Sequence, residues 1–262
     1  MWMLDGRGGL AAVLYGASTV RARVGATGQP VEIIQTTDYP FGEEITFTIR
    51  TAGPVSFPFL LRVPAWCRAP QVALNDRTLD LVPDRKGWIR LQRTFRPNDH
   101  VVLRLPMHTA VSYWPNGRSR DAVGLEHGPL VYALPVREAW ASTVTPRWST
   151  VEFPEWDATP AGPWNYGMAG VETTLPAEAQ LQRGPMTADP WVEPPVRLTV
   201  PLKRIPGWDL RVDARHADRR QTPPLPEIDD ELSKALATAS VEQVALVPYG
   251  ATHLRLTVFP KV

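Results

Sequence analysis

The chain has 262 residues, including 28 Pro, 18 Gly, 10 Trp and a single Cys. Its 28 basic and 27 acidic residues nearly balance and are scattered, which argues against a nucleic-acid partner or a membrane-surface role, because both need a basic excess on one face. No run of 18 apolar residues occurs, so we expect no membrane span. The lone Cys and the absence of a signal-peptide pattern favour the cytoplasm.

Residues 1–106 alternate apolar and polar side chains with a period of two, which is typical of strands that bury one face. The clearest runs are 19–24, 44–50, 57–63 and 101–105. Turn-forming residues separate the runs, among them the Asn-Asp pair at 75–76 and the Pro-Asn-Asp sequence at 97–99. Many short strands with frequent turns predict an antiparallel β-sandwich or barrel.

Residues 107–245 are expected to form a second, more irregular β-sandwich-like domain. From 137 to 195 the chain is rich in Pro and Trp and weakly periodic, which predicts long ordered loops over a sheet. Glu227–Ala239 could form a short helix with acidic residues at its start. The alternation at 252–259 resembles the first block, so we expect a strand within 246–262 to return to the first sandwich. The predicted fold is all-β: two antiparallel β-sandwich domains with long Pro/Trp-rich loops and at most one short helix.

Residue patterns for catalysis, cofactors or metals are weak, and we assign no residue to any of these roles. Cys67 lacks an obvious activating base and is expected to be a small buried apolar residue. Glu155 and Asp157 offer two carboxylates, but residues i and i+2 of a strand point the same way and cannot flank a glycosidic bond. The five His residues show no metal-binding spacing.

The Trp residues are the most unusual feature, and four of them are spaced eight apart, at Trp140, Trp148, Trp156 and Trp164. The favoured interpretation is that they pin irregular loops onto the sheet, since Trp is usually well buried. The alternative is a row of exposed rings that stacks on sugar faces. Under that alternative the candidate sugar-stacking residues are Trp156 and Trp164.

A series of short segments, in order, resembles glycoside hydrolase family 127, the β-L-arabinofuranosidase-like enzymes. The resemblance extends over almost the whole chain and is carried by these segments: Gly9-Leu10-Ala11-Ala12-Val13-Leu14-Tyr15, Thr37-Asp38-Tyr39-Pro40-Phe41, Leu61-Arg62-Val63-Pro64-Ala65-Trp66-Cys67, Phe95-Arg96-Pro97-Asn98-Asp99, Leu105-Pro106-Met107, His127-Gly128-Pro129-Leu130-Val131-Tyr132, Pro163-Trp164-Asn165-Tyr166 and Leu246-Val247-Pro248-Tyr249-Gly250.

The resemblance implies an N-terminal catalytic (α/α) barrel followed by two β-sandwich domains, of which only the sandwiches match here. It also implies a Cys nucleophile, a Glu acid/base and a zinc ion held by Cys and Glu, all in the barrel. Cys67 does not align with that nucleophile, which lies in a Cys-Cys pair before the equivalent of Met1. We therefore expect no cofactor in this chain, zinc in the barrel, and that barrel, within the same parent polypeptide, as the main partner.

Three functions follow as expectations. The first is a non-catalytic β-sandwich portion of a family 127-type glycoside hydrolase, which supports the barrel and is inactive alone; the chain is then a fragment, or it works beside a separate barrel subunit. The second is a carbohydrate-binding module that uses the Trp-rich face, with a glycan as partner. The third is a partner-binding scaffold with an exposed apolar patch.

Overall fold

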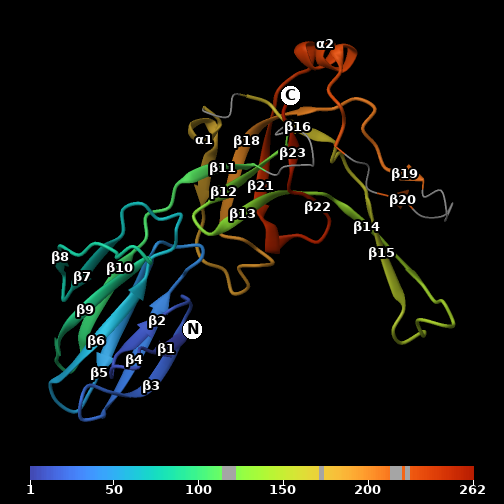
Figure 1. The fold of residues 1–262 in the computed structure, drawn as a ribbon. Coiled ribbons are helices and arrows are strands. Elements are labelled where there is room, and N and C mark those ends of the chain that lie inside the picture. The colour runs from blue at the N-terminus through green and yellow to red at the C-terminus, as the bar shows by residue number, and fades with distance from the viewer. Residues whose placement is uncertain (114–121, 171–173, 213–219, 222–224) are drawn as a thin grey trace. The chain divides into compact units, whose positions relative to one another are not determined.

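The computed structural model describes residues 1–113, 122–170, 174–212, 220–221 and 225–262. The chain divides into two compact units, Met1–His108 and Thr109–Val262 (Figure 1). The described residues form strands in several sheets and two α-helices, only one of which exceeds a single turn. The predicted all-β fold is therefore correct. None of the described helices has the length and apolar character needed to cross a membrane.

The first unit is a sandwich of two sheets. One sheet has the strand order β1-β2-β6-β9 and the other β3-β4-β5-β10-β7-β8. The strands are β1 (Trp2–Leu4), β2 (Leu10–Ala12), β3 (Ser18–Val24), β4 (Gln29–Thr37), β5 (Glu44–Arg50), β6 (Val55–Arg62), β7 (Gln71–Leu74), β8 (Arg77–Leu79), β9 (Trp88–Phe95) and β10 (Asp99–Arg104).

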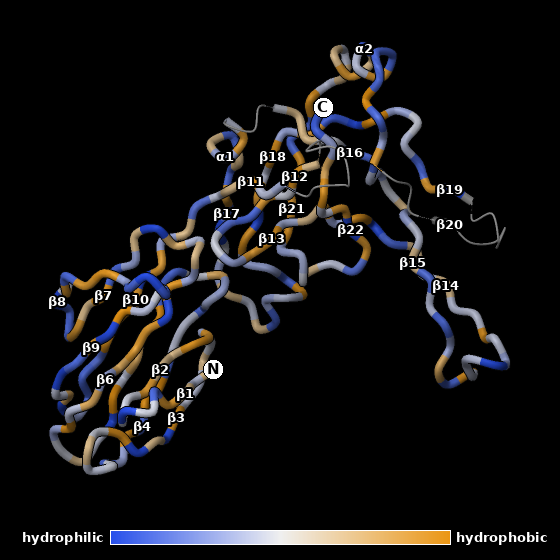
Figure 2. Tube along the Cα trace, viewed as in Figure 1, coloured by the Kyte–Doolittle hydropathy of each residue, from blue (hydrophilic) through white to orange (hydrophobic). Residues whose placement is uncertain are grey.

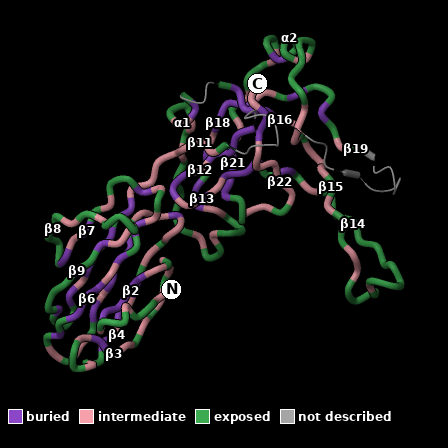
Figure 3. The backbone as a smooth tube through the Cα atoms, viewed as in Figure 1, coloured by how far each residue is buried: buried purple, intermediate pink, exposed green. Residues whose placement is uncertain are grey.

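The core of this sandwich lies between the inward faces of the sheets, as the period-two pattern predicts. In β5, Ile45, Phe47 and Ile49 are fully buried, whereas the alternate residues are not. Figure 3 shows buried stretches along the strands of this unit. The ring of Phe47 meets that of Phe59 on β6 edge to face, with centroids 5.2 Å apart, so the two sheets are in direct aromatic contact. The same alternation of hydropathy runs along the strands in Figure 2.

The predicted turns and strand directions hold with one exception. Asn75, Asp76 and Asn98 all have positive φ, the conformation that Asn and Asp tolerate best among non-Gly residues. The exception is that β2 and β6 pair in parallel. The two strands are separated by three strands of the other sheet, so no tight hairpin forces them to run in opposite directions.

The second unit is built on one nine-stranded sheet with the main order β11-β12-β13-β21-β18-β16. Its strands are β11 (Thr109–Tyr113), β12 (Ala122–His127), β13 (Leu130–Pro135), β16 (Tyr166–Met168), β17 (Gln180–Arg183), β18 (Val196–Arg204), β21 (Glu242–Pro248), β22 (Arg255–Leu256) and β23 (Phe259–Pro260). β23 pairs with β12, and Lys261 bridges to Met168 on β16, so the pairing closes into a ring.

The last strands occupy a different place from the one predicted. The segment expected to return to the first sandwich forms β21, β22 and β23, which pair with β18, β13 and β12 of the second unit. Only Arg255–Leu256 and Phe259–Pro260 are strands within the predicted run 252–259. Alternation reports that one face is buried but not which sheet buries it, and this is why the prediction was wrong.

Smaller elements complete the second unit. They are the hairpin β14 (Glu138–Thr143) and β15 (Glu155–Pro160), the pair β19 (Arg211–Val212) and β20 (Arg220–Gln221), α1 (Leu175–Glu178), α2 (Asp230–Thr238) and the 3₁₀ turn η1 (Tyr249–Ala251). α2 falls inside the predicted helix, and Asp229 caps it by accepting a hydrogen bond from the Leu232 N–H. The hairpin lies in the stretch predicted to be loops; both of its faces are largely exposed, so it lacks the alternation that marks a half-buried strand.

Candidate functional site

The Trp residues of the hairpin are exposed, contrary to the favoured expectation that they pin loops. Trp140 and Trp156 are 49% and 60% exposed, and Trp148, in the loop between the strands, is 72% exposed. Trp140 lies opposite Ala158 and Trp156 opposite Ser142, which places the two rings diagonally on one face of the hairpin. The Arg147 guanidinium sits over the Trp148 ring, 4.8 Å from its centroid.

Trp164 behaves differently, because it is partly buried and rests on a small core. That core is formed by Ile205, Trp208 and Leu236. The rings of Trp164 and Trp208 are tilted by 59° with centroids 5.0 Å apart, and Trp208 is only 7% exposed. For this residue the pinning interpretation fits, yet part of the ring still faces open space.

The loop that carries Trp164 is tied to the sheet on both sides. Arg137 donates from Nε to the Ala161 carbonyl at 2.7 Å, and the Ala161 N–H donates to the Arg137 carbonyl at 2.7 Å. Asn165 donates from Nδ2 to the Ile205 carbonyl at 2.9 Å, and the Ile205 N–H donates back to the Asn165 carbonyl at 2.8 Å. The position of the Trp164 ring is therefore set by backbone bonds as well as by packing.

Two adjoining cavities meet at Trp164. The larger, about 860 Å³, is lined by both predicted stacking residues, Trp156 and Trp164. The smaller, about 610 Å³, is lined by Trp164 and by Asn165, Arg204 and Asp209. The cavities share Thr159, Pro160, Trp164, Trp208 and Leu210, so they adjoin at the base of the hairpin, and the two together are called the groove below.

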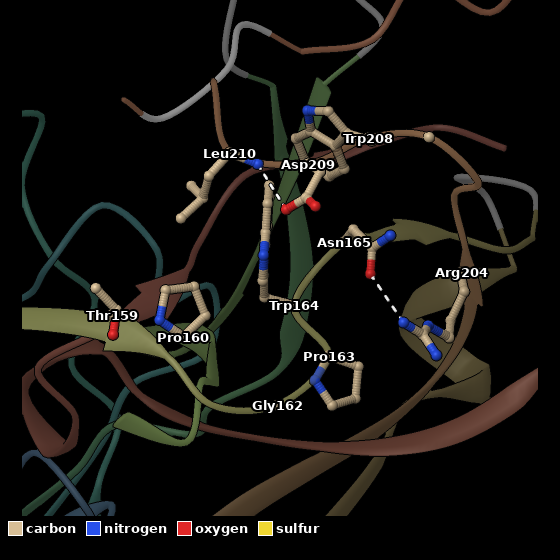
Figure 4. A pocket seen from close by; sticks show the side chains of 11 residues that line it. Thr159, Pro160, Gly162, Pro163, Trp164, Asn165, Arg204, Trp208, Asp209 and Leu210 are labelled. Atoms are coloured by element: carbon tan, nitrogen blue, oxygen red, sulfur yellow. Dashed lines mark hydrogen bonds between the residues drawn. The ribbon is translucent and has the colours of Figure 1, made fainter. Parts of the chain in front are cut away.

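Figure 4 shows how the groove is arranged around the Trp164 ring. The ring is seen edge-on, with Leu210, Thr159 and Pro160 on one side and Asn165 and Arg204 on the other (Figure 4). The guanidinium of Arg204 donates from Nη2 to Asn165 Oδ1 at 3.4 Å. Asp209 accepts a hydrogen bond at Oδ1 from the Leu210 N–H at 2.7 Å. The Trp164 ring, one cation, one carboxylate and an amide thus line the smaller cavity, while the larger one is also lined by Glu155, Asp157 and Arg255.

Sequence reasoning missed the polar half of this groove. Asn165 precedes β16, Arg204 ends β18, and Asp209 lies in the loop beyond it. Residues 39 positions apart in the chain carry no shared motif, and only the pairing of β16 with β18, which sets Tyr166 opposite Arg204, brings them together. The Pro163–Tyr166 segment was singled out for its resemblance and not for this geometry.

The other sequence candidates do not assemble into a catalytic site. Cys67 is buried in the first unit, and this burial raises the pKa of its thiol, so it is a poor nucleophile. Glu155 and Asp157 lie opposite Thr143 and Ala141 on one face of the hairpin, which cannot place them on both sides of a bond.

The described residues contain no cluster of side chains that could bind a metal ion. Among them no group of three or more His, Cys, Asp or Glu side chains lies close enough to hold a metal ion. The zinc of the family that the sequence resembles therefore does not fit the residues described here, and no reaction step through zinc follows from them.

The sequence of the first unit matches a known protein family. Residues 9–107 match the family model "Beta-L-arabinofuranosidase, GH127 middle domain". No curated protein shows a significant match. The resemblance to family GH127 that the sequence motifs indicated is confirmed over residues 9–107 by this match.

Solved structures share the fold over the whole chain. A GH127 β-L-arabinofuranosidase from Geobacillus stearothermophilus T6 superposes with a TM-score of 0.62 at 21% identity, covering 99% of this chain and 34% of its own. A GH127 β-arabinofuranosidase gives 0.59 at 17%, covering 98% and 35%, and a glycoside hydrolase gives 0.60 at 18%, covering 99% and 37%. The chain thus spans about a third of the length of the solved structures that it matches.

Proposed function

We propose that the chain is the non-catalytic β-sandwich portion of a GH127-type glycoside hydrolase and that it supports a catalytic (α/α) barrel. The main support for the proposal is the extent of the structural match. It includes 99% of this chain but only 34% of a GH127 β-L-arabinofuranosidase. Glu155 and Asp157 lie on one face of the hairpin and cannot flank a bond, and burial raises the pKa of the Cys67 thiol, in keeping with chemistry that takes place in the rest of the polypeptide.

Apolar side chains at one edge of the first unit support a packing role. Met3 and Leu4 on β1 are 61% and 65% exposed, and Leu14, just after β2, is 55% exposed. The Val13 and Leu14 N–H groups both donate to the Met1 carbonyl, which holds this segment against β1. Met3 and Leu4 are consecutive on the strand and point to opposite faces, so large apolar side chains are exposed on both sides of this sheet edge, and this exposure supports contact with another domain.

The reading frame upstream of the Met1 codon tests the proposal. We expect an in-frame segment that encodes an (α/α) barrel with a Cys-Cys pair, or a separate barrel gene beside this one. A stop codon directly upstream, in a genome that encodes no such barrel, would contradict the proposal.

A second candidate function is carbohydrate binding, and the specific observation in its favour is that Trp156 and Trp164 line one cavity. Calorimetric titration with neutral oligosaccharides tests it. We expect Trp156→Ala to weaken binding at least about tenfold, as the loss of a central aromatic contact does. Trp148→Ala is the matched control, because Trp148 is also exposed on the hairpin but lines neither cavity. Equal losses in both variants would point to unspecific contact with the hairpin and contradict the candidate.

A further inference from the structure

We propose that the smaller cavity is a subsite for one ring of a neutral saccharide, which stacks on the Asn165 side of Trp164 and is held through its hydroxyls by Asp209 and Arg204. This inference rests on the carbohydrate-binding candidate above and adds its polar recognition residues and the charge class of its ligand. The geometry that points to it is that Trp164, Asn165, Arg204 and Asp209 line the same cavity (Figure 4).

Trp164 is suited to act as a fixed platform. Its ring packs against Trp208, and its loop is held by reciprocal hydrogen bonds between Asn165 and Ile205. A ring that is already fixed loses little conformational freedom when a ligand stacks on it, so more of the contact energy contributes to affinity. The apolar face of a sugar ring complements the face of an aromatic ring such as that of Trp164.

Asp209 and Arg204 retain hydrogen-bonding capacity for a ligand. Asp209 uses Oδ1 for the Leu210 N–H, and a carboxylate has further lone pairs on both oxygens. Arg204 uses one of the five guanidinium N–H donors for Asn165. Within the described part of the chain, neither side chain forms an ion pair, and both are exposed to solvent.

The balance of charge selects the ligand class. The cavity lining carries one cation, Arg204, and one anion, Asp209, so its formal charges cancel. A hydroxyl donates to a carboxylate and accepts from a guanidinium, and charge-assisted bonds of this kind are the stronger ones. A sugar carboxylate would be attracted by Arg204 and repelled by Asp209, so it gains no net attraction from the lining. The volume of about 610 Å³ lies within the usual ~300–1,000 Å³ of small-molecule sites.

The test is calorimetric titration of the full 262-residue chain with neutral trisaccharides (arabinotriose, xylotriose and cellotriose) and with trigalacturonate as the charged counterpart. Asp209→Asn keeps the Oδ1 acceptor for Leu210 but removes the charge, and Arg204→Gln removes the cation; both positions are exposed, so folding is expected to be retained. We expect each variant to weaken binding of a neutral trisaccharide about tenfold or more.

The matched controls are Arg197→Gln, an exposed Arg on the same strand β18, and Asp189→Asn, which also accepts a backbone N–H, from Trp191. Neither residue lines either cavity, so both variants should bind like the parent chain. The proposal is overturned if no trisaccharide binds, if Asp209→Asn and Arg204→Gln bind as the controls do, or if trigalacturonate binds more tightly than the neutral sugars. Each of these results leaves the barrel-supporting role intact, since that role depends on the upstream gene.

Discussion

Two buried Tyr side chains differ in one respect that decides what each hydroxyl contributes. The Tyr166 hydroxyl donates to Glu242 Oε2 at 2.8 Å, whereas that of Tyr132 has no hydrogen-bond partner among the described residues. Burial raises the pKa of both, that of Tyr132 to about 12, so both stay protonated at neutral pH. Replacing each Tyr by Phe should therefore change the free energy of unfolding differently at the two positions.

We expect Tyr166→Phe to lower the free energy of unfolding of the second unit by about 1–2 kcal/mol, because Glu242 loses a donor. Tyr132→Phe should leave it unchanged or raise it by up to about 1 kcal/mol, because the buried hydroxyl has no bond to lose. Urea unfolding, monitored by amide hydrogen exchange, measures the free energy of unfolding of both variants. A larger loss for Tyr132→Phe than for Tyr166→Phe would show that the Tyr132 hydroxyl is satisfied.

Glu138 connects the hairpin to the C-terminal strands. Its Oε1 accepts the Leu254 N–H at 2.6 Å, and its Oε2 accepts Trp140 Nε1–H at 2.8 Å. The Leu254 bond is the main reason that the pKa of Glu138 is lowered, with smaller contributions from Trp140 and His253. A lowered folded-state pKa means that these contacts stabilise the fold above the unfolded value of about 4.3, and that this stabilisation is lost as the pH falls through the folded pKa.

The amide resonance of Leu254 should report this titration. We expect its chemical shift to change with a midpoint below about 4.3, and the change to vanish in Glu138→Gln, which keeps an acceptor but cannot ionise. A midpoint at or above about 4.3 would mean that the charged form is not the one the fold stabilises.

Among the strands, the period-two pattern predicted where a strand lies, but it did not predict which strand it pairs with. The runs around Ile45 and Phe57 are strands because their apolar faces meet in one core. The hairpin 138–160 left no such trace, because neither of its faces is well buried. The groove was found only in part: Trp156 and Trp164 stood out by residue type, whereas Arg204 and Asp209 are ordinary surface residues until β16 and β18 pair.

The placement of the C-terminal strands can be tested directly. Phe259 on β23 is fully buried beside β12, so Phe259→Ala should cost about 3–5 kcal/mol, all of it in the second unit. Phe57→Ala, in β6 of the first unit, is the matched control. Hydrogen exchange resolved by unit should show each variant loosening only its own unit. Faster exchange in β3–β10 of Phe259→Ala would instead favour a C-terminal strand that completes the first sandwich.

At the scale of the whole molecule, the chain combines a sandwich with the GH127 middle-domain sequence and a ring-closed sheet that carries an aromatic groove. Among the described residues, Glu155 and Asp157 lie on one face of the hairpin and no metal donor set occurs, whereas Trp156 and Trp164 line one cavity. We therefore propose that this chain contributes support and sugar contact, and that bond cleavage takes place in a barrel.

Hydrolysis by the purified 262-residue chain tests that separation most directly. With 4-nitrophenyl β-L-arabinofuranoside as substrate, we expect no release of nitrophenol above the buffer rate at any pH where the chain stays folded. Release at an ordinary enzymatic rate, about 1 s⁻¹ or faster, by a preparation free of other hydrolases would contradict it.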